Sequence, residues 1–236
     1  MGQSYFIWNG IDCRTQGIML RKPAPLIRPE ERVKHTTIPG LSGDLTEIEG
    51  EHVYNSYIQT VEMSVRDGTQ VRHIFDWLRG GGFVTFSSDP DKQQPARVIG
   101  AVTLERVSRN LDHWAGTVQF YCQPLKQRMY DIAETLTASG TIQNRGDVAS
   151  RPVIVATPSN GATTMTITVN GSSLALTGVD GVRRIDCQTQ EISNEGQTAL
   201  YTVKSAGQFP ILERGGNLIT GTGWASLAIY KNERFL

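Results

Sequence analysis

Most of the chain alternates apolar and polar residues in short stretches bounded by Gly, Pro, Asn or Asp, which is the pattern of β-strands. The stretch 61–65 places Val, Met and Val on one face and Glu and Ser on the other, and the stretch 118–122 alternates in the same way. Both stretches predict half-buried antiparallel strands. Another strand is expected over Phe83–Phe86.

One segment departs from this rhythm and predicts an amphipathic helix near residues 69–79. Asp67 or Thr69 can cap its first turn by accepting a backbone N–H, and the glycines at 80–82 suit the left-handed geometry that ends helices. The apolar residues at helical spacing are Val71, Ile74, Phe75 and Leu78.

The second half of the chain predicts a set of short strands joined by turns, as in a β-sandwich. Asn170-Gly171 is a strong hairpin signal, because it separates the alternating stretches 165–169 and 174–176. The other strands expected here are Val153–Thr157, Arg183–Asp186, Leu200–Val203 and Leu227–Tyr230.

The alternation is lost between residues 126 and 140, and turn residues follow at 144–147 and at Arg151-Pro152. We therefore expect two domains, at 1–130 and 140–236. The predicted fold class is mainly β, with a sandwich-like first domain that carries the one helix and a β-sandwich as the second domain.

The composition of the chain argues against several classes of function. The 236 residues include 23 Lys and Arg and 23 Asp and Glu, so no bulk attraction to nucleic acid or to an anionic membrane is expected. Cys13, Cys122 and Cys187 are far apart and form no CxxC pair, which favours reduced, partly buried thiols over a disulfide framework or a zinc site. Neither a membrane span nor a leader peptide is expected.

No motif predicts catalysis, a cofactor or a metal. The stretch Gly40–Asp44 lacks the spacing of a nucleophile elbow and is interpreted as a tight loop. The four histidines include no HxH or HxxxH pair, and Asp89-Pro90-Asp91 lacks the rest of a calcium loop. Alternating glutamates at 47, 49 and 51 indicate a solvated strand face rather than an acid–base pair.

Two remaining features have an ordinary structural interpretation. Arg145-Gly146-Asp147 spells an integrin-like tripeptide, but it falls where a turn is already expected. Trp224 could stack on a sugar, although a core tryptophan is the more frequent case.

The order and spacing of several short motifs resemble the distal tail protein (Dit) family of long-tailed bacteriophages. The resemblance runs through nearly the whole chain, although Leu41 stands where arginine is common and the chain ends in a less basic, less aromatic sequence. The motifs are Phe6–Asp12, Gly17-Ile18, Ile38–Leu45, Asp76–Leu78, Gly82-Phe83, Asp89-Pro90, Phe120–Pro124, Asn144–Pro152, Val169–Gly171, Ile185-Asp186, Phe209-Pro210 and Gly215–Asn217.

This resemblance implies a structural protein and not an enzyme. It implies a homohexameric ring below the tail tube, through which DNA passes, built by the first domains while galectin-like second domains project outward. The implied partners are the tail tube protein, the tail-tip spike protein and, in many phages, receptor-binding proteins, with the tape measure protein as a further candidate. The implied location is the virion tail tip, after assembly in the bacterial cytoplasm.

A closed ring needs two different surfaces of one subunit that match each other. From their apolar and glycine content, we expect the strand around Phe6 and Trp8 and the loop Ile38–Leu45 at that interface. Its residues would be Phe6, Trp8, Ile38, Pro39, Gly40, Gly43 and Asp44. The alternative function is a carbohydrate-binding module for host cell-surface glycans, in which Trp224 would contact the sugar.

Overall fold

The computed structural model describes residues 3–48, 50, 52–194 and 203–236. It divides into two compact units, of which unit 1 comprises Met1–Met129 with Leu236 and unit 2 comprises Tyr130–Phe235. The fold is mainly β, as the sequence predicts. No described helix is long and apolar enough to cross a membrane.

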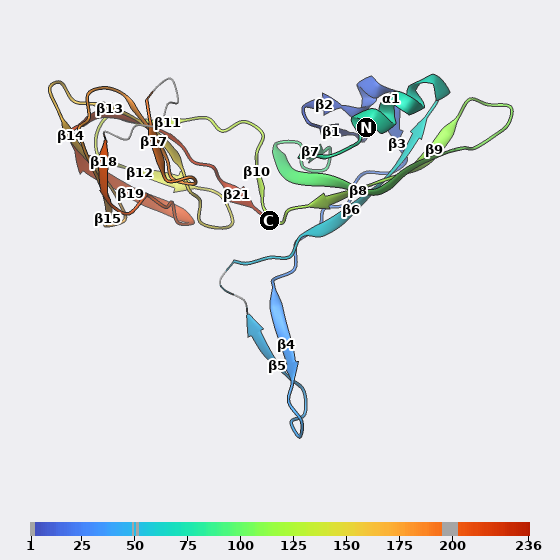
Figure 1. The fold of residues 1–236 in the computed structure, drawn as a ribbon, viewed down its shortest axis with the longest axis horizontal. Coiled ribbons are helices and arrows are strands. Elements are labelled where there is room, and N and C mark those ends of the chain that lie inside the picture. The colour runs from blue at the N-terminus through green and yellow to red at the C-terminus, as the bar shows by residue number, and fades with distance from the viewer. Residues whose placement is uncertain (1–2, 49, 51, 195–202) are drawn as a thin grey trace. The chain divides into compact units, whose positions relative to one another are not determined.

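Unit 1 is built on one antiparallel sheet with the strand order β2-β1-β7-β8-β9-β6-β3, and β10 pairs with the start of β8 (Figure 1). Its strands are β1 (Phe6–Trp8), β2 (Ile11–Asp12), β3 (Ile18–Leu20), β4 (Val33–Thr37), β5 (Asp44–Ile48), β6 (Tyr57–Val65), β7 (Gly81–Phe86), β8 (Lys92–Arg106), β9 (Trp114–Cys122) and β10 (Lys126–Arg128). Its helical elements are the 3₁₀ turns η1 (Cys13–Gln16) and η2 (Gly68–Gln70) and the helix α1 (Val71–Trp77).

The core of unit 1 centres on the ring of Phe120 in β9. Phe6 and Trp8 of β1 and Phe86 of β7 lie around it, with ring centroids 5.5, 5.3 and 6.0 Å from that of Phe120. Trp77 of α1 stacks on Phe6 at 5.8 Å. These rings connect β1, β7, β9 and the helix, so the aromatic cluster stabilises the sheet and the helix as one unit.

The helix is shorter than its apolar pattern predicts. Its entry is one 3₁₀ turn, capped by Asp67, whose carboxylate accepts hydrogen bonds from the backbone N–H and the hydroxyl of Thr69. Ile74 and Leu78 are buried in the core as expected, but Phe75 is exposed. Successive helical residues are about 100° apart, so a seven-residue helix that buries Ile74 and Leu78 turns Phe75 to its flank.

Unit 2 is a sandwich of two five-stranded antiparallel sheets, with strand orders β11-β20-β13-β16-β17 and β12-β19-β14-β15-β18. The strands of the two sheets are β11 (Glu134–Leu136), β12 (Gly140–Asn144), β13 (Val153–Pro158), β14 (Thr164–Val169), β15 (Ser172–Thr177), β16 (Arg183–Asp186), β17 (Glu191–Ser193), β18 (Lys204–Gly207), β19 (Gly215–Thr222) and β20 (Trp224–Tyr230). The short strand β21 (Arg234–Phe235) also lies in unit 2 but belongs to neither of these sheets. Unit 2 begins ten residues before the expected position 140, because β11 pairs with β20 and so belongs to the sandwich.

The sandwich core comes from the alternation seen in the sequence. Buried residues from both sheets form one cluster, including Ile154 and Leu227 from one sheet and Ile167 and Ile219 from the other. Asn170 and Gly171 form the expected turn between β14 and β15, and both have positive φ, of 49° and 87°. Most of the strand expected at Leu200–Val203 lies outside the described residues.

Gly116 allows β8 and β9 to pair closely in unit 1. A Cβ at this position would overlap the backbone carbonyl of Thr103 on β8. We expect Gly116→Ala to destabilise unit 1 by about 1–3 kcal/mol, the usual cost of forcing an extra group into a packed interior.

The matched control is Gly81→Ala, since a Cβ there would meet the Ala96 carbonyl at an ordinary 3.7 Å. Thermal unfolding of the two variants measures the difference. Equal melting temperatures would contradict the close approach of the two strands.

Candidate functional site

The β4–β5 hairpin is the most exposed secondary structure of unit 1. Its two strands pair with each other in the register Val33↔Ile48 to Thr37↔Asp44, and neither pairs with the main sheet among the described residues (Figure 1). Polar contacts cross it, because the Thr37 hydroxyl donates to the Asp44 carboxylate at 2.7 Å. The hairpin therefore forms a two-stranded arm of its own.

The turn of this hairpin is the predicted loop Gly40–Asp44. Gly40 and Gly43 have φ of 87° and 90°, which side chains other than glycine rarely adopt. The N–H of Leu41 donates to the carbonyl of Ile38 at 3.1 Å, which closes the turn after Pro39. The stretch is the turn of a hairpin, which agrees with the tight loop that the sequence predicts.

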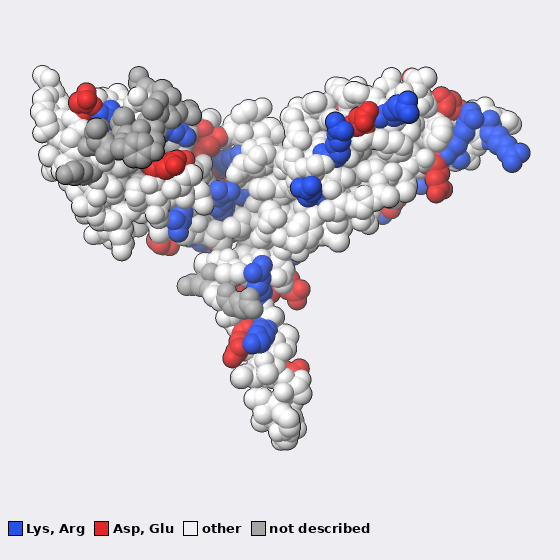
Figure 2. Space-filling view, in the orientation of Figure 1, with Lys and Arg blue, Asp and Glu red and all other residues white. Residues whose placement is uncertain are grey.

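Large apolar side chains of the hairpin face solvent. They are Ile38 (41% exposed), Leu41 (57%), Leu45 (45%) and Ile48 (65%). Figure 2 shows an uncharged surface at the end of the hairpin. These side chains make the hairpin a candidate interaction surface, because exposed apolar side chains that gather in one place are typical of contact sites.

The structure separates the two predicted interface segments. Phe6 and Trp8 are fully buried in the core of unit 1, and their strand is paired on both sides, with β2 and β7. Their side chains are not exposed to a neighbouring molecule. Ile38, Pro39, Gly40, Gly43 and Asp44 all lie in the exposed hairpin. Whether either segment lies at a subunit interface stays a prediction.

Trp224 begins β20 and packs in the core of the sandwich, with only 8% of its surface exposed. A sugar stacks on an open aromatic face, and this ring offers none. No observation on the described residues of unit 2 therefore favours the carbohydrate-binding alternative.

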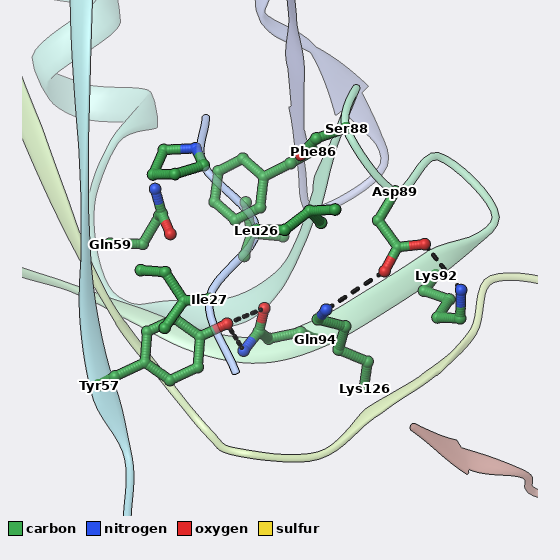
Figure 3. Close-up of a pocket in the computed structure, with 12 residues that line it drawn as sticks. Leu26, Ile27, Tyr57, Gln59, Phe86, Ser88, Asp89, Lys92, Gln94 and Lys126 are labelled. Atoms are coloured by element: carbon green, nitrogen blue, oxygen red, sulfur yellow. Dashed lines mark hydrogen bonds and ion pairs between the residues drawn. The ribbon is translucent and has the colours of Figure 1, made fainter. Parts of the chain in front are cut away.

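A small pocket in unit 1 lies beneath the segment Pro25–Ile27 (Figure 3). Tyr57 and Gln94 exchange hydrogen bonds in its wall at 2.7 and 3.1 Å, and burial raises the pKa of Tyr57 to about 12. The cavity volume is about 10 Å³, room for roughly one water molecule and not for an organic ligand.

Asp89 lies at the rim of this pocket between two lysines. Its carboxylate accepts from Lys92 at 2.7 Å and from Lys126 at 3.2 Å. Burial alone would raise the pKa of Asp89, but the hydrogen bonds from both ammonium groups outweigh it and hold the pKa below its usual value. The group is a structural ion cluster at the start of β8 and in β10.

The three cysteines are free and buried. Burial raises the pKa of Cys13 to about 11 and those of Cys122 and Cys187 to about 12, so all three thiols stay protonated near neutral pH. Among the described residues, no group of three or more His, Cys, Asp or Glu side chains could hold a metal ion.

The described residues thus define a two-unit, mainly β fold whose conspicuous feature is an exposed apolar arm. This fold is similar along its whole length to the crystal structure of SPP1 Dit (gp 19.1), described as a paradigm of the hub adsorption apparatus in phages that infect Gram-positive bacteria. The TM-score is 0.80, the sequence identity is 17%, and the match covers 100% of both chains. No protein-family model and no curated protein matches the sequence. The likeness confirms the fold that the resemblance to distal tail proteins implies.

The ion cluster around Asp89 predicts how the stability of unit 1 depends on pH. Asp89→Asn removes the carboxylate that Lys92 and Lys126 share, while Lys92 keeps its contact with Asp91 at 3.5 Å, and we expect a cost of about 1–3 kcal/mol at pH 7. Because the folded pKa of Asp89 is lowered, its contribution is complete above the unfolded value of 3.8 and is lost as the pH falls through the folded value.

Urea unfolding of the original protein and the variant at pH 7 and at pH 3 measures this dependence. We expect a clear difference in the free energy of unfolding at pH 7 and a smaller one at pH 3. A difference that stays constant with pH would contradict the role of the carboxylate charge.

Proposed function

We propose that the chain is a distal tail protein: a structural component of a bacteriophage virion that forms a hub at the distal end of the tail. The observation that carries this proposal is the whole-chain match to SPP1 Dit, which covers both units in one alignment. The motifs of the sequence also support it, because they follow one another in the order typical of the family through both units.

In this proposal six copies form a closed ring below the tail tube, and DNA passes through its lumen. Ring closure requires a heterologous contact, in which one surface of a subunit meets a different surface of the next. The β4–β5 hairpin supplies one such surface, because its apolar side chains have no cover in the described part of the chain. The hairpin residues Ile38, Pro39, Gly40, Gly43 and Asp44 would then lie at the interface.

Phe6 and Trp8 have a different role in this scheme. They are core residues, so they would support the ring by holding β1 against β7 and not by touching a neighbour. Replacing Trp8 would destabilise unit 1 itself, and only substitutions in the hairpin can test the contact separately.

The remaining partners follow from the position of such a hub. The ring would bind the tail tube protein on one side and the tail-tip spike protein on the other, with receptor-binding or tape measure proteins as further partners. Unit 2 would be the outward, galectin-like domain. Assembly would take place in the bacterial cytoplasm, and the mature protein would be found in the virion.

Ring formation can be measured on the purified chain. We expect light scattering after size exclusion to give a mass near six times 26.0 kDa at high concentration, and negative-stain images to show closed six-fold rings. A chain that stays monomeric at every concentration, both alone and with a tail tube protein, would contradict the proposal.

The contribution of the hairpin can be tested with Leu41→Asp. A charge at this exposed apolar position should abolish the ring, because its burial against a neighbour becomes unfavourable, while the melting temperature stays unchanged. Leu218→Asp is the control, since Leu218 is 54% exposed but belongs to unit 2. Rings that form equally well with Leu41→Asp would remove the hairpin from the interface.

A further inference from the structure

The dipeptide Asn-Gly occurs three times in the chain, at Asn9-Gly10, Asn160-Gly161 and Asn170-Gly171. Asparagine is thermally labile, and most of all before glycine. The backbone nitrogen of the glycine attacks the side-chain carbon Cγ and expels ammonia, since glycine has no Cβ to obstruct the approach. All three sites share this local chemistry, so a difference in their reactivity has to come mainly from the fold.

Asn9 and Asn170 occupy equivalent positions in two tight hairpins. The first loop connects β1 to β2 and the second connects β14 to β15, and each consists of Asn and then Gly. Both residues of each loop have positive φ, of 50° and 79° in the first loop and 49° and 87° in the second. Positive φ at both central positions defines the type I′ turn, whose backbone fits the twist of the two strands.

A neighbouring strand also holds the side chain of each of these two residues. The backbone N–H of Asn9 donates to the carbonyl of Phe83 on β7, and the N–H of Phe83 donates to Oδ1 of Asn9, both at 2.9 Å. Asn170 exchanges the same two hydrogen bonds with Leu218 on β19, both at 3.0 Å. A backbone N–H requires an acceptor, so Oδ1 has to face the strand in both cases. We call this pair of hydrogen bonds the strand clamp.

Gly82 on β7 makes room for the strand clamp at Asn9. A Cβ on Gly82 would overlap Oδ1 of Asn9, and the three atoms nearest to that Cβ all belong to the Asn9 side chain. A side chain at position 82 would therefore expel the amide of Asn9 from the clamp while the Asn-Gly dipeptide itself stays unchanged.

Asn160 has no strand clamp. It lies with Gly161 in the exposed turn between β13 and β14, which is closed by the N–H of Ala162 donating to the carbonyl of Ser159 at 3.0 Å. Within the described ranges of the chain, no residue forms a hydrogen bond with the side chain of Asn160. A Cβ on Gly161 would meet no atom within 4 Å, so water reaches the dipeptide freely.

The attack of glycine on Cγ needs a rotation that the strand clamp prevents. The side chain of the asparagine and the peptide group after it have to turn toward each other before the new bond can form. At Asn9 and Asn170 this rotation breaks the hydrogen bond from the neighbouring strand and leaves a backbone N–H without its acceptor. At Asn160 it takes place in open solvent and breaks no such bond.

We propose that Asn160 is a site of spontaneous modification, at which water converts the exposed amide into a carboxylate, and that the strand clamp suppresses this reaction at Asn9 and Asn170. The nitrogen of Gly161 bonds to Cγ of Asn160, the Cγ–Nδ2 bond breaks, and the proton of the Gly161 N–H leaves with the ammonia. Water then opens the cyclic imide at either carbonyl, which gives aspartate or an isoaspartyl linkage.

The consequence is a change of charge on the surface of unit 2. The turn 159–162 reads Ser-Asn-Gly-Ala and is uncharged, and the reaction makes it anionic. An isoaspartyl linkage also adds a methylene to the main chain between β13 and β14. The reaction needs only one folded chain and water, so it does not depend on the proposed hub.

Mass spectrometry of tryptic peptides tests the proposal in the full chain. Asn160 and Asn170 share the peptide Gly146–Arg183, because trypsin cleaves poorly at Arg151-Pro152, and fragment ions assign the exchange of NH₂ for OH to one of them. After incubation in mildly alkaline buffer, we expect Asn160 to convert faster than Asn9 and Asn170 by about tenfold or more, the order expected when a hydrogen bond has to break first. A sample digested without incubation gives the background.

Two controls separate the fold from the sequence. In the same buffer with urea, which removes the strand clamp, all three sites should convert at similar rates. Asn160→Gln keeps an exposed amide but requires a larger, slower-forming ring. The chain has 23 basic and 23 acidic residues, so isoelectric focusing should show an acidic band that grows in the original protein and is lost in Asn160→Gln.

Gly82→Ala tests the strand clamp itself. We expect Asn9 to convert in this folded variant at a rate that approaches that of Asn160, because its side chain is expelled from the clamp. The matched control is Gly81→Ala on the same strand, where a Cβ meets the Ala96 carbonyl at an ordinary 3.7 Å and Asn9 stays protected. Circular dichroism reports the folding of both variants, and the comparison of the three sites in the original protein does not depend on either.

Each outcome decides one part of the proposal. Faster conversion at Asn160 in the folded chain, with similar rates in urea, supports it. Equal conversion of the three sites in the folded chain overturns it, and so does an Asn160 that stays at the background. A faster Asn160 in urea as well assigns the difference to flanking residues and overturns the role of the fold. An unmodified Asn9 in folded Gly82→Ala overturns the strand clamp as the cause of protection.

Discussion

The register between β6 and β9 is the constraint on which unit 1 depends. Val61 pairs with Val118, and both are buried, while Phe120 brings three aromatic rings together around β9. Side chains alternate with period two along each strand, so a slip by one residue would turn the whole buried set outward. The same register necessarily sets which residues lie on the opposite, exposed face of the sheet. Core packing and the composition of that exposed face are thus two consequences of one strand pairing.

Much of this arrangement could be predicted from sequence, because burial on one face of a sheet leaves a visible alternation. The strands around 61–65 and 118–122, the turn at Asn170-Gly171 and the division near residue 130 all have such local signals. The exposure of Phe75 has no such local signal in the sequence, since it depends on where a short helix lies on the core. The apolar character of Phe6 and Trp8 likewise predicts that both are buried, but it does not distinguish burial in the core from burial at an interface.

The β4–β5 hairpin shows a different limit of sequence interpretation. Its turn residues Pro39, Gly40 and Gly43 are recognisable, but its strands alternate weakly, because neither face packs on the sheet of its own unit. The exposed face of the main sheet gives no sequence signal either, since Ile58, Tyr121 and Arg97 resemble the solvated side of ordinary strands until the register brings them into one row.

The place of the hairpin in unit 1 bears on the separate roles of the two units in the proposed hub. The hairpin belongs to unit 1, so a ring closed through it and another surface of unit 1 would need no contact from unit 2. The sandwich has its own core and its own two sheets, and its fold does not depend on ring closure. Substitutions on the surface of unit 2 would then change what the hub presents to other proteins without changing how the hub assembles. In the proposed hub, this separation of assembly from presentation would let unit 2 vary while unit 1 keeps the symmetry of the ring.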